Sequence, residues 1–314
     1  MGSEASIAQR VDEHTHVPEE KLVMKPPFPD AIKIELTSYC NLKCSYCASQ
    51  FKLRPQGEID EQFLKDILRQ AKTVGVKEIG MFLLGESFLV KKLPEYIRYA
   101  KEDAGIEYVF LTTNGTLCTM DRLVPVIDAG LDSLKFSINA GTPERYAKMH
   151  GVDFFDKVVA NIKNMREYME KQGLEKPRTC VSSIFDEDYR DELENLRDMI
   201  MPYVDEFYYL PLYNQAGHIQ DKKRSMFVGN PGRYENMVPP VPCWGIFNGA
   251  KISWDGWLTA CYFDHDKRFR IADLNRFSLM DAWHHEKFVN LRRQHLENDG
   301  LSKSLCGKCL GLAF

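Results

Sequence analysis

Short apolar runs alternate with amphipathic stretches over the first two thirds of the chain. The apolar runs have the length and the β-branched and aromatic content of buried strands, and they lie at residues 32–37, 77–84, 106–113, 133–139, 178–185 and 206–214. The stretches between them repeat apolar residues at helical spacing, at residues 60–72, 92–105, 120–130, 143–173 and 186–204. This alternation predicts an α/β fold with a right-handed wind of parallel strands. A closed barrel needs eight such units, so six strands predict a partial (β/α)6 barrel.

The alternation stops near residue 215, where Gly, Pro and polar residues become frequent. Further on, an alternating β pattern is broken by Asp255-Gly256, which is typical of a hairpin turn, and a helical pattern covers residues 278–298. We therefore expect a small α+β domain after the barrel. The predicted organisation is a flexible, polar and proline-rich lead-in at 1–30, the barrel at 31–214, a linker at 215–242 and the small domain at 243–314.

Composition narrows the class of protein. The 314 residues carry 41 basic and 45 acidic side chains, a formal net charge of −4, so no overall positive field favours nucleic acid. No apolar run approaches the roughly 20 residues that span a bilayer, and the first residues lack the apolar core of an export signal. Nine cysteines are present, and seven of them lie in two groups. This clustering predicts metal sites in a reducing compartment, and we expect a cytoplasmic protein with neither membrane nor nucleic acid as partner.

The first group is "CNLKCSYC", which places Cys40, Cys44 and Cys47 in the loop after the first predicted strand. Parallel α/β barrels carry their chemistry on such loops. Three thiols leave a tetrahedral zinc ion one ligand short, so a zinc reading requires a histidine or a fourth cysteine from elsewhere.

The motif resembles the cluster-binding motif of the radical S-adenosylmethionine (SAM) superfamily, including the aromatic Tyr46 before the last cysteine. The resemblance implies that the three thiolates hold three irons of a 4Fe-4S cluster, and that the fourth iron binds the amino and carboxylate groups of SAM. Further segments at predicted strand ends resemble the SAM contacts of the family. They are Gly85 and Glu86 in "LLGES", Thr113 and Asn114 in "TTNG", and Ser137 and Asn139 in "FSIN". Ser87 departs from the proline that is more common after the acid.

The second group contains Cys243, Cys261, Cys306 and Cys309, which frame the predicted hairpin and helix. Spacing alone favours a zinc ribbon. Next to a radical SAM motif, however, the segment resembles the twitch half of a SPASM domain. That resemblance implies a second 4Fe-4S cluster with full ligation by four cysteines, whose role is electron transfer. The segment is most similar to that of aminocyclitol dehydrogenases and related sugar-modifying enzymes of natural product biosynthesis.

The resemblance implies that SAM is cleaved to a 5′-deoxyadenosyl radical, which removes hydrogen from an unactivated carbon. Our first hypothesis is dehydrogenation of a carbinol carbon in a sugar or aminocyclitol, with the auxiliary cluster accepting one electron and a flavodoxin or ferredoxin as reductant. The dehydrogenase relative has an arginine base where this chain has Gln215, which cannot accept a proton. Tyr213, His218 and Glu35 are the alternative bases.

Three other functions stay open at this point. Epimerisation requires a thiol as hydrogen donor, and Cys118 and Cys180 are the spare cysteines, although each also fits a small buried hydrophobic position. Maturation of a ribosomal peptide is a further radical SAM reaction. A zinc-stabilised binding module without catalysis is the non-enzyme alternative.

Overall fold

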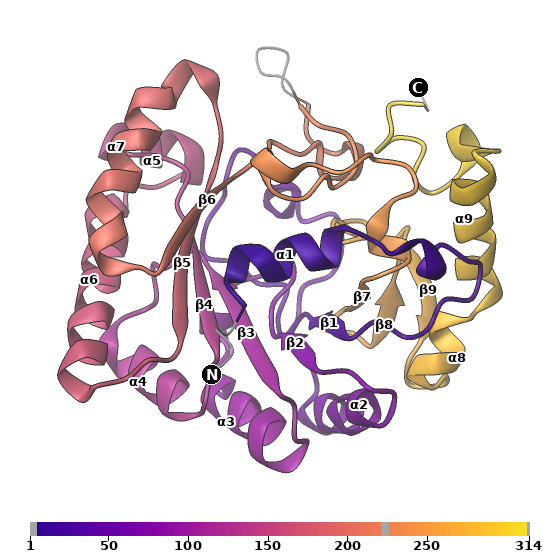
Figure 1. Cartoon of the computed structure of the whole chain (residues 1–314), viewed down its shortest axis with the longest axis horizontal. Helices are drawn as coiled ribbons and strands as arrows, with labels where there is room; N and C mark the ends of the chain where they lie inside the picture. Colours follow the sequence, from indigo (N-terminus) through magenta and orange to yellow (C-terminus); the bar gives the residue numbers. More distant parts are fainter. Residues whose placement is uncertain (1–4, 221–225, 313–314) are drawn as a thin grey trace.

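Six parallel strands form the predicted partial barrel in the computed structural model, which describes residues 5–220 and 226–312 (Figure 1). They lie side by side in the order β6-β5-β4-β3-β2-β1. Their bounds are Ala31–Ile34 (β1), Glu78–Gly80 (β2), Tyr108–Thr113 (β3), Ser133–Ser137 (β4), Arg178–Ile184 (β5) and Glu206–Leu210 (β6). β1 pairs with β2 on one side and with a C-terminal strand on the other, so the sheet does not close on β6. The predicted fold class is confirmed.

Helices follow the strands along the chain and cover the outside of the sheet (Figure 1). Their bounds are Glu61–Thr73 (α2), Leu93–Arg98 (α3), Met120–Asp128 (α4), Pro143–His150 (α5), Phe155–Gln172 (α6) and Arg190–Ile200 (α7). The single helix predicted over 143–173 is therefore two helices. α5 ends at Gly151, whose φ of +83° is a left-handed conformation that glycine adopts without strain.

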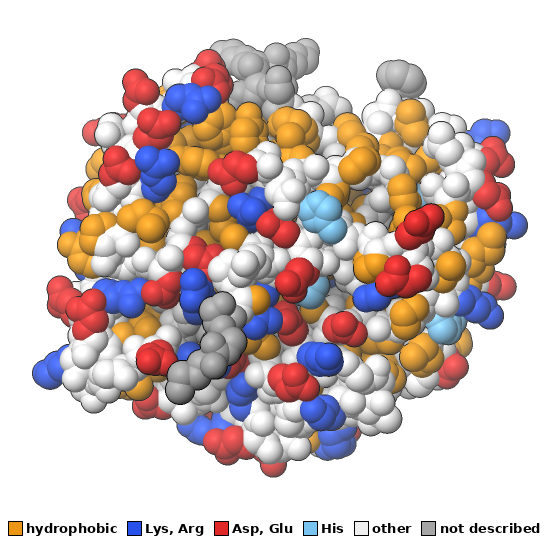
Figure 2. All heavy atoms as spheres, viewed as in Figure 1, with side chains coloured by type: hydrophobic (Ala, Val, Ile, Leu, Met, Phe, Trp, Pro, Cys, Tyr) orange, Lys and Arg blue, Asp and Glu red, His pale blue; other side chains and the backbone are white. Residues whose placement is uncertain are grey.

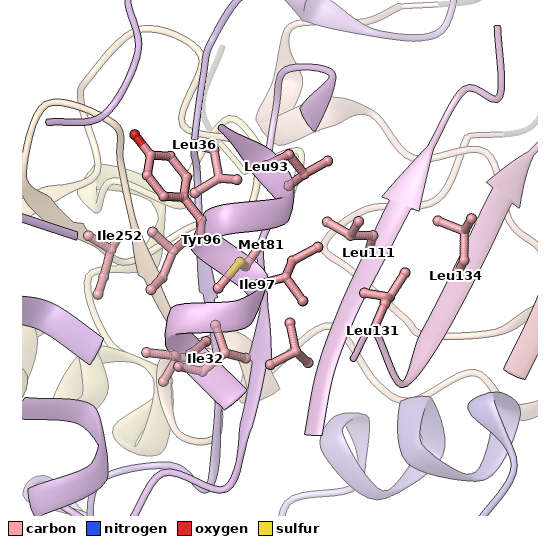
Figure 3. Close-up of a cluster of buried hydrophobic side chains, with 14 of the residues drawn as sticks. Ile32, Leu36, Met81, Leu93, Tyr96, Ile97, Leu111, Leu131, Leu134 and Ile252 are labelled. Carbon is pink, nitrogen blue, oxygen red and sulfur yellow. The ribbon is translucent and has the colours of Figure 1, made fainter. Parts of the chain in front are cut away.

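The two faces of the sheet differ in polarity because side chains alternate along each strand. The outer face supplies apolar side chains to the main core, where they meet α3 and the other outer helices. Figure 3 shows this packing, with Met81 beside Ile97 of α3 and with Leu111 and Leu134 on the next two strands. The inner face carries polar and aromatic side chains, among them Lys33, Tyr108 and Lys135, which surround an internal cavity.

The prediction of a flexible lead-in at residues 1–30 is wrong for the segment that forms a helix. Residues Ile7–Thr15 form a helix, α1, which begins with a capping box between Ser6 and Gln9. α1 lies across the inner side of the barrel, between β6 and the C-terminal part (Figure 1). The Glu206 carboxylate at the start of β6 accepts hydrogen bonds from the first N–H groups of α1, at 2.8 and 2.9 Å. Residues of the helix, among them Arg10 and His14, line the cavity and so form part of its wall.

The C-terminal part extends the barrel sheet. Strands Ala250–Ile252 (β7), Trp257–Thr259 (β8) and Arg270–Asp273 (β9) continue the order beyond β1, with β7 parallel to β1 and the hairpin pairs antiparallel. The predicted hairpin is confirmed, and Gly256 in its turn has φ +86°. The predicted helix over 278–298 is split into Leu279–Trp283 (α8) and Glu286–Glu297 (α9).

The surface view shows acidic and basic side chains interspersed over this face of the molecule (Figure 2). This distribution agrees with the small net charge of −4. In the described ranges no helix combines the length and the apolar character needed to cross a bilayer.

Candidate active site and auxiliary cysteine site

The loop that carries Cys40, Cys44 and Cys47 follows β1 at the carboxyl end of the sheet. Backbone hydrogen bonds tie it to the end of α5, because the Lys43 N–H donates to the His150 carbonyl at 3.3 Å. On its other side the Glu86 N–H donates to the Tyr39 carbonyl at 2.9 Å. The loop is therefore held between two elements that are distant in the sequence.

Burial and the neighbouring cysteines raise the pKa values of two thiols in this loop. Burial, together with the charges of Cys47 and Cys40, raises the pKa of Cys44 to about 12. Burial, with smaller contributions from Glu86 and Cys47, raises the pKa of Cys40 to about 11. Within residues 5–220 and 226–312, no three His, Cys, Asp or Glu side chains have the arrangement of ligands around a single metal ion. In an iron–sulfur cluster each thiolate binds its own iron, so the three sulfurs lie further apart than around one ion.

Tyr46 lies in a network that the sequence did not predict. Its hydroxyl oxygen accepts a hydrogen bond from Asn139 Nδ2 at 2.6 Å and lies 3.3 Å from His150 Nδ1. The same His150 nitrogen is 3.4 Å from Cys44 Sγ, and its ring stacks on Tyr146 with centroids 4.1 Å apart. Burial lowers the pKa of His150 to about 4, so the ring is neutral at pH 7. His150 carries no spacing signal in the sequence, and only the fold brings it to the cysteine loop.

Gly85 and Glu86 lie beside the cysteine loop, as the motif comparison predicted. A Cβ atom on Gly85 would lie 2.1 Å from the Thr37 carbonyl oxygen, so only glycine fits this position. The buried Glu86 carboxylate accepts hydrogen bonds from Thr113 Oγ1 and the Asn114 N–H, both at 2.8 Å. The "LLGES" and "TTNG" segments are thus joined through one carboxylate.

The remaining candidate SAM contacts lie at the same end of the sheet. Asn114 Nδ2 donates to Asn41 Oδ1 in the cysteine loop at 2.9 Å. Ser137, the last residue of β4, lines the internal cavity. Asn139 is buried, and its Oδ1 accepts a hydrogen bond from the Ile184 N–H at 2.7 Å. The polar strand ends thus lie together at the cysteine loop. Two of these side chains, Glu86 and Asn139, also hold the protein backbone in place through hydrogen bonds.

The second cysteine group lines one small cavity of about 30 Å³, which all four thiols share: Cys243, Cys261, Cys306 and Cys309. Their charges act on one another. Burial, followed by the charges of Cys243 and Cys309, raises the pKa of Cys306. Lys251 lies near them, and its Nζ donates to the Gly245 and Gly249 carbonyls at 2.5 and 2.6 Å. Four sulfurs around one cavity, beside a buried cation, fit a negatively charged thiolate-bound cluster.

A larger cavity of about 370 Å³ separates the two cysteine groups. Tyr46 and Cys47 line it on the side of the first loop. Tyr262 and Phe263, which directly follow Cys261, line it on the side of the second group. The cavity therefore extends from the first cysteine loop to the residues that directly follow Cys261.

The three candidate catalytic residues differ in their access to this cavity. Tyr213 lines it, but its hydroxyl donates to the Gly232 carbonyl at 2.7 Å, and burial raises its pKa. Cys118 and Cys180 are both fully buried. Cys118 Sγ lies 3.7 Å from Thr113 Oγ1, and Cys180 packs beside Tyr208. Among the residues that the structure describes, neither thiol belongs to the cavity lining.

The alternative bases are paired elsewhere. Gln215 lines the cavity and its Oε1 is 2.9 Å from His265 Nε2. Glu35 is fully buried in an ion pair with Arg54. His218 Nε2 lies 3.4 Å from a carboxylate oxygen of Asp266. Of these three residues only Gln215 lines the cavity, and its amide cannot accept a proton.

Comparison with known proteins agrees with this geometry. The radical SAM superfamily model matches residues 34–200, which is more than half of the chain, and the model of the SPASM iron–sulfur cluster-binding domain matches residues 243–310. The two matches cover the two cysteine groups separately.

Two curated relatives illustrate the sequence similarity. An uncharacterized protein of Methanocaldococcus jannaschii is 32% identical over 208 residues, which cover 65% of this chain and 65% of the relative. The GTP 3′,8-cyclase of Chlorobaculum tepidum is 33% identical over 130 residues, which cover 41% of this chain and 38% of the cyclase. The matched segments therefore span less than two thirds of these relatives.

Solved structures share the fold across both parts of the chain. BtrN in complex with AdoMet and 2-DOIA has a TM-score of 0.60 at 18% identity, covering 90% of this chain and 92% of BtrN. Streptococcus suis SuiB bound to the precursor peptide SuiA has a TM-score of 0.67 at 15% identity, covering 90% and 68%. The cofactors that the two domains imply are two 4Fe-4S clusters and SAM. The chain belongs to the radical SAM superfamily and carries a C-terminal SPASM domain.

Proposed function

We propose that this radical SAM enzyme is an oxidoreductase that oxidises a carbinol carbon of a small polar substrate to a ketone. The observation that carries the proposal is the cavity of about 370 Å³ between the two cysteine groups. Its volume lies in the range of small-molecule sites. A substrate there would have Cys47 on one side and Phe263, two residues from Cys261, on the other.

In this proposal Cys40, Cys44 and Cys47 hold the cluster that binds SAM, and Tyr46, Gly85, Glu86, Thr113, Asn114, Ser137 and Asn139 surround SAM. The hydrogen bonds of Glu86 to Thr113 and Asn114 support this set, because they fix two strand ends next to the cysteine loop. When bound, the cluster and SAM together supply a hydrogen-abstracting 5′-deoxyadenosyl radical. The walls of the cavity position the substrate.

The second site supports oxidation. Its four thiols share one cavity, so a cluster bound there would have a cysteine for every iron and would supply an electron acceptor. The substrate loses a hydrogen atom from its carbinol carbon, which forms 5′-deoxyadenosine. It then loses the hydroxyl proton to cavity water and one electron to the second site, and becomes a ketone.

The geometry does not favour epimerisation. A thiol donor must reach the substrate radical, and both spare thiols, Cys118 and Cys180, are buried outside the lining of the cavity. Peptide maturation finds support in the structural neighbour SuiB, whose structure contains the precursor peptide SuiA. The cavity volume favours a small molecule instead. We propose a reduced flavodoxin or ferredoxin as electron donor in the cytoplasm.

The test is anaerobic turnover of the reconstituted enzyme with dithionite, SAM and a panel of sugars, aminocyclitols and their acids and phosphates. We expect 5′-deoxyadenosine to form in equal amount with a product two mass units lighter than its substrate. Cys44→Ala should abolish both products, whereas Cys180→Ala should retain both. A product of unchanged mass that contains one solvent deuterium, and that Cys180→Ala or Cys118→Ala abolishes, would replace oxidation with epimerisation.

A further inference from the structure

Two lysines project into the cavity from opposite parts of the barrel sheet. Lys33 lies on β1 and Lys135 on β4, and both line the cavity. Each is half-buried, and the surface that it exposes faces the cavity. The strand β3 lies between them and gives a common reference. Lys33 is level with Phe110 of β3, because both pair with Gly80 of β2, whereas Lys135 pairs with Thr112 of β3. Lys135 is therefore two residues closer to the carboxyl ends of the strands.

Neither ammonium group has an anionic partner in the described ranges 5–220 and 226–312. The Lys33 Nζ lies 4.5 Å from the centroid of the Tyr262 ring and 5.0 Å from that of Phe82. The Lys135 Nζ lies 5.7 Å from the Tyr208 ring centroid. These are contacts with aromatic faces rather than ion pairs.

The other charged side chains of the cavity wall neutralise one another. Arg10 of α1 pairs with Glu78 of β2, and His14 Nε2 is 3.3 Å from the second oxygen of the same carboxylate. Glu78 is thus already shared by two partners on α1. Within the part of the chain that the structure describes, Lys33 and Lys135 are left without an anionic partner.

Unpaired buried cations are unfavourable unless something compensates them. Burial, with the charges of Lys135 and Lys251, lowers the pKa of Lys33 to about 7. Burial also lowers the pKa of Lys135. A bound oxyanion would favour the charged form of both lysines and would form charge-assisted hydrogen bonds with them.

We infer that the substrate carries an oxyanionic group, a carboxylate or a phosphate, that binds between Lys33 and Lys135. This inference rests on the proposed function, because it names the class of molecule that occupies the same cavity. Both lysines lie on the strands, below the loop of Cys47, so the anion would anchor one end of the substrate deep in the barrel. The other end would then face the cysteine loop. Two cations at this position disfavour the positively charged aminocyclitols among the substrates that we considered.

The test compares small probes that differ in charge but share a trifluoromethyl group: trifluoroacetate, trifluoroethanol and trifluoroethylammonium. Their binding to the reconstituted enzyme with SAM is measured by ¹⁹F NMR line broadening, and that of inorganic phosphate by ³¹P NMR. We expect saturable binding of trifluoroacetate or phosphate, and the stronger of the two identifies carboxylate or phosphate as the group. We expect at least tenfold weaker binding of the ammonium probe.

Lys33→Met and Lys135→Met should each weaken anion binding at least tenfold. Lys91→Met is the matched control, since Lys91 is exposed and the substitution changes the net charge equally. Iron content and the visible spectrum show whether each variant is folded and loaded. Equal binding of the ammonium probe, absence of saturable binding of both anions, or unchanged anion binding in both cavity variants would each overturn the inference. Turnover of the substrate panel, measured in parallel as 5′-deoxyadenosine together with a product two mass units lighter, tests the proposed function separately.

Discussion

At the scale of single residues, the cavity contains side chains that are unfavourable for folding. Lys33 is the clearest case, because its ammonium faces aromatic rings and two further lysines, Lys135 and Lys251, act on it. Its pKa falls from 10.5 to about 7 on folding. Such positions commonly trade stability for function.

Lys33→Met should therefore stabilise the protein. The gain should be on the order of 2 kcal/mol below pH 7, where Lys33 is charged in both the folded and the unfolded chain. Between pH 7 and about pH 10.5, Lys33 is neutral in the folded chain but still protonated in the unfolded chain. The folded wild-type protein therefore becomes more stable as the pH rises, and the gain from Lys33→Met should shrink. Urea unfolding under argon at about pH 6 and about pH 9.5 measures both values.

The matched control is again Lys91→Met, which should change the unfolding free energy by less than about 0.5 kcal/mol at either pH. If Lys33→Met destabilises the protein, or has the same effect at both pH values, Lys33 is not an uncompensated buried cation in the free enzyme.

At the scale of elements, the N-terminal segment, which was predicted to be a flexible lead-in, instead contributes helix α1 to the wall of the cavity. Its capping box, Ser6 with Gln9, was a readable signal in the sequence, but the surrounding residues are mostly polar. Its position depends on long-range partners. Glu206 caps its N-terminus, and Arg233 Nη2 lies 2.7 Å from the Asp12 carboxylate.

Glu206→Ala should release α1 locally. The first two N–H groups of the helix lose their acceptor, which costs about 1–2 kcal/mol. We expect amide hydrogen exchange in residues 7–15 to accelerate about tenfold, because about 1.4 kcal/mol corresponds to a factor of ten. Mass spectrometry of the corresponding peptides measures this exchange.

Glu206 also accepts a hydrogen bond from Arg178 Nε at 2.5 Å, so Arg178→Ala serves as the control. That variant removes the ion pair and leaves the helix cap in place. Equal acceleration in Arg178→Ala and Glu206→Ala would show that the ion pair, rather than the cap, holds α1.

At the scale of the whole molecule, the two parts that the sequence separates share one sheet. β7 pairs with β1 in parallel register, Lys33 opposite Lys251. The predicted linker also contributes to the cavity, which Asn230 and Gly232 line. The SPASM domain and the barrel therefore share one continuous sheet and are not two separate units joined by a linker.

A fragment of residues 1–242 should fail to fold as the barrel does in the full chain. Without β7, β1 becomes an edge strand with unpaired backbone groups next to the cysteine loop. We expect aggregation on gel filtration and loss of exchange protection in residues 31–34. Iron bound at the first site should also be lost.

The full-length double variant Cys306→Ser, Cys309→Ser separates the sheet from the cluster. It keeps β7 and removes two of the four second-site ligands. It should retain protection of β1 and about four of about eight irons. A fragment 1–242 that is monomeric and holds about four irons would contradict the role assigned to β7.

The sequence by itself determined the alternation of strands and helices, the partial barrel and both cysteine groups. These features are local, because strand periodicity and the spacing within "CNLKCSYC" depend on neighbouring residues. The convergence of "LLGES", "TTNG" and "FSIN" could also be predicted, since the carboxyl ends of parallel strands share one edge.

Only the tertiary structure decided what surrounds the chemistry. It brought Asn139 to Tyr46, 93 residues apart, and His150 to Cys44, 106 residues apart. It buried Cys118 and Cys180 outside the cavity lining and left Lys33 and Lys135 unpaired within the described chain. The physical reason is that burial and pairing depend on every element around a side chain. A local pattern specifies where a residue lies along a strand, but not which distant charge neutralises it.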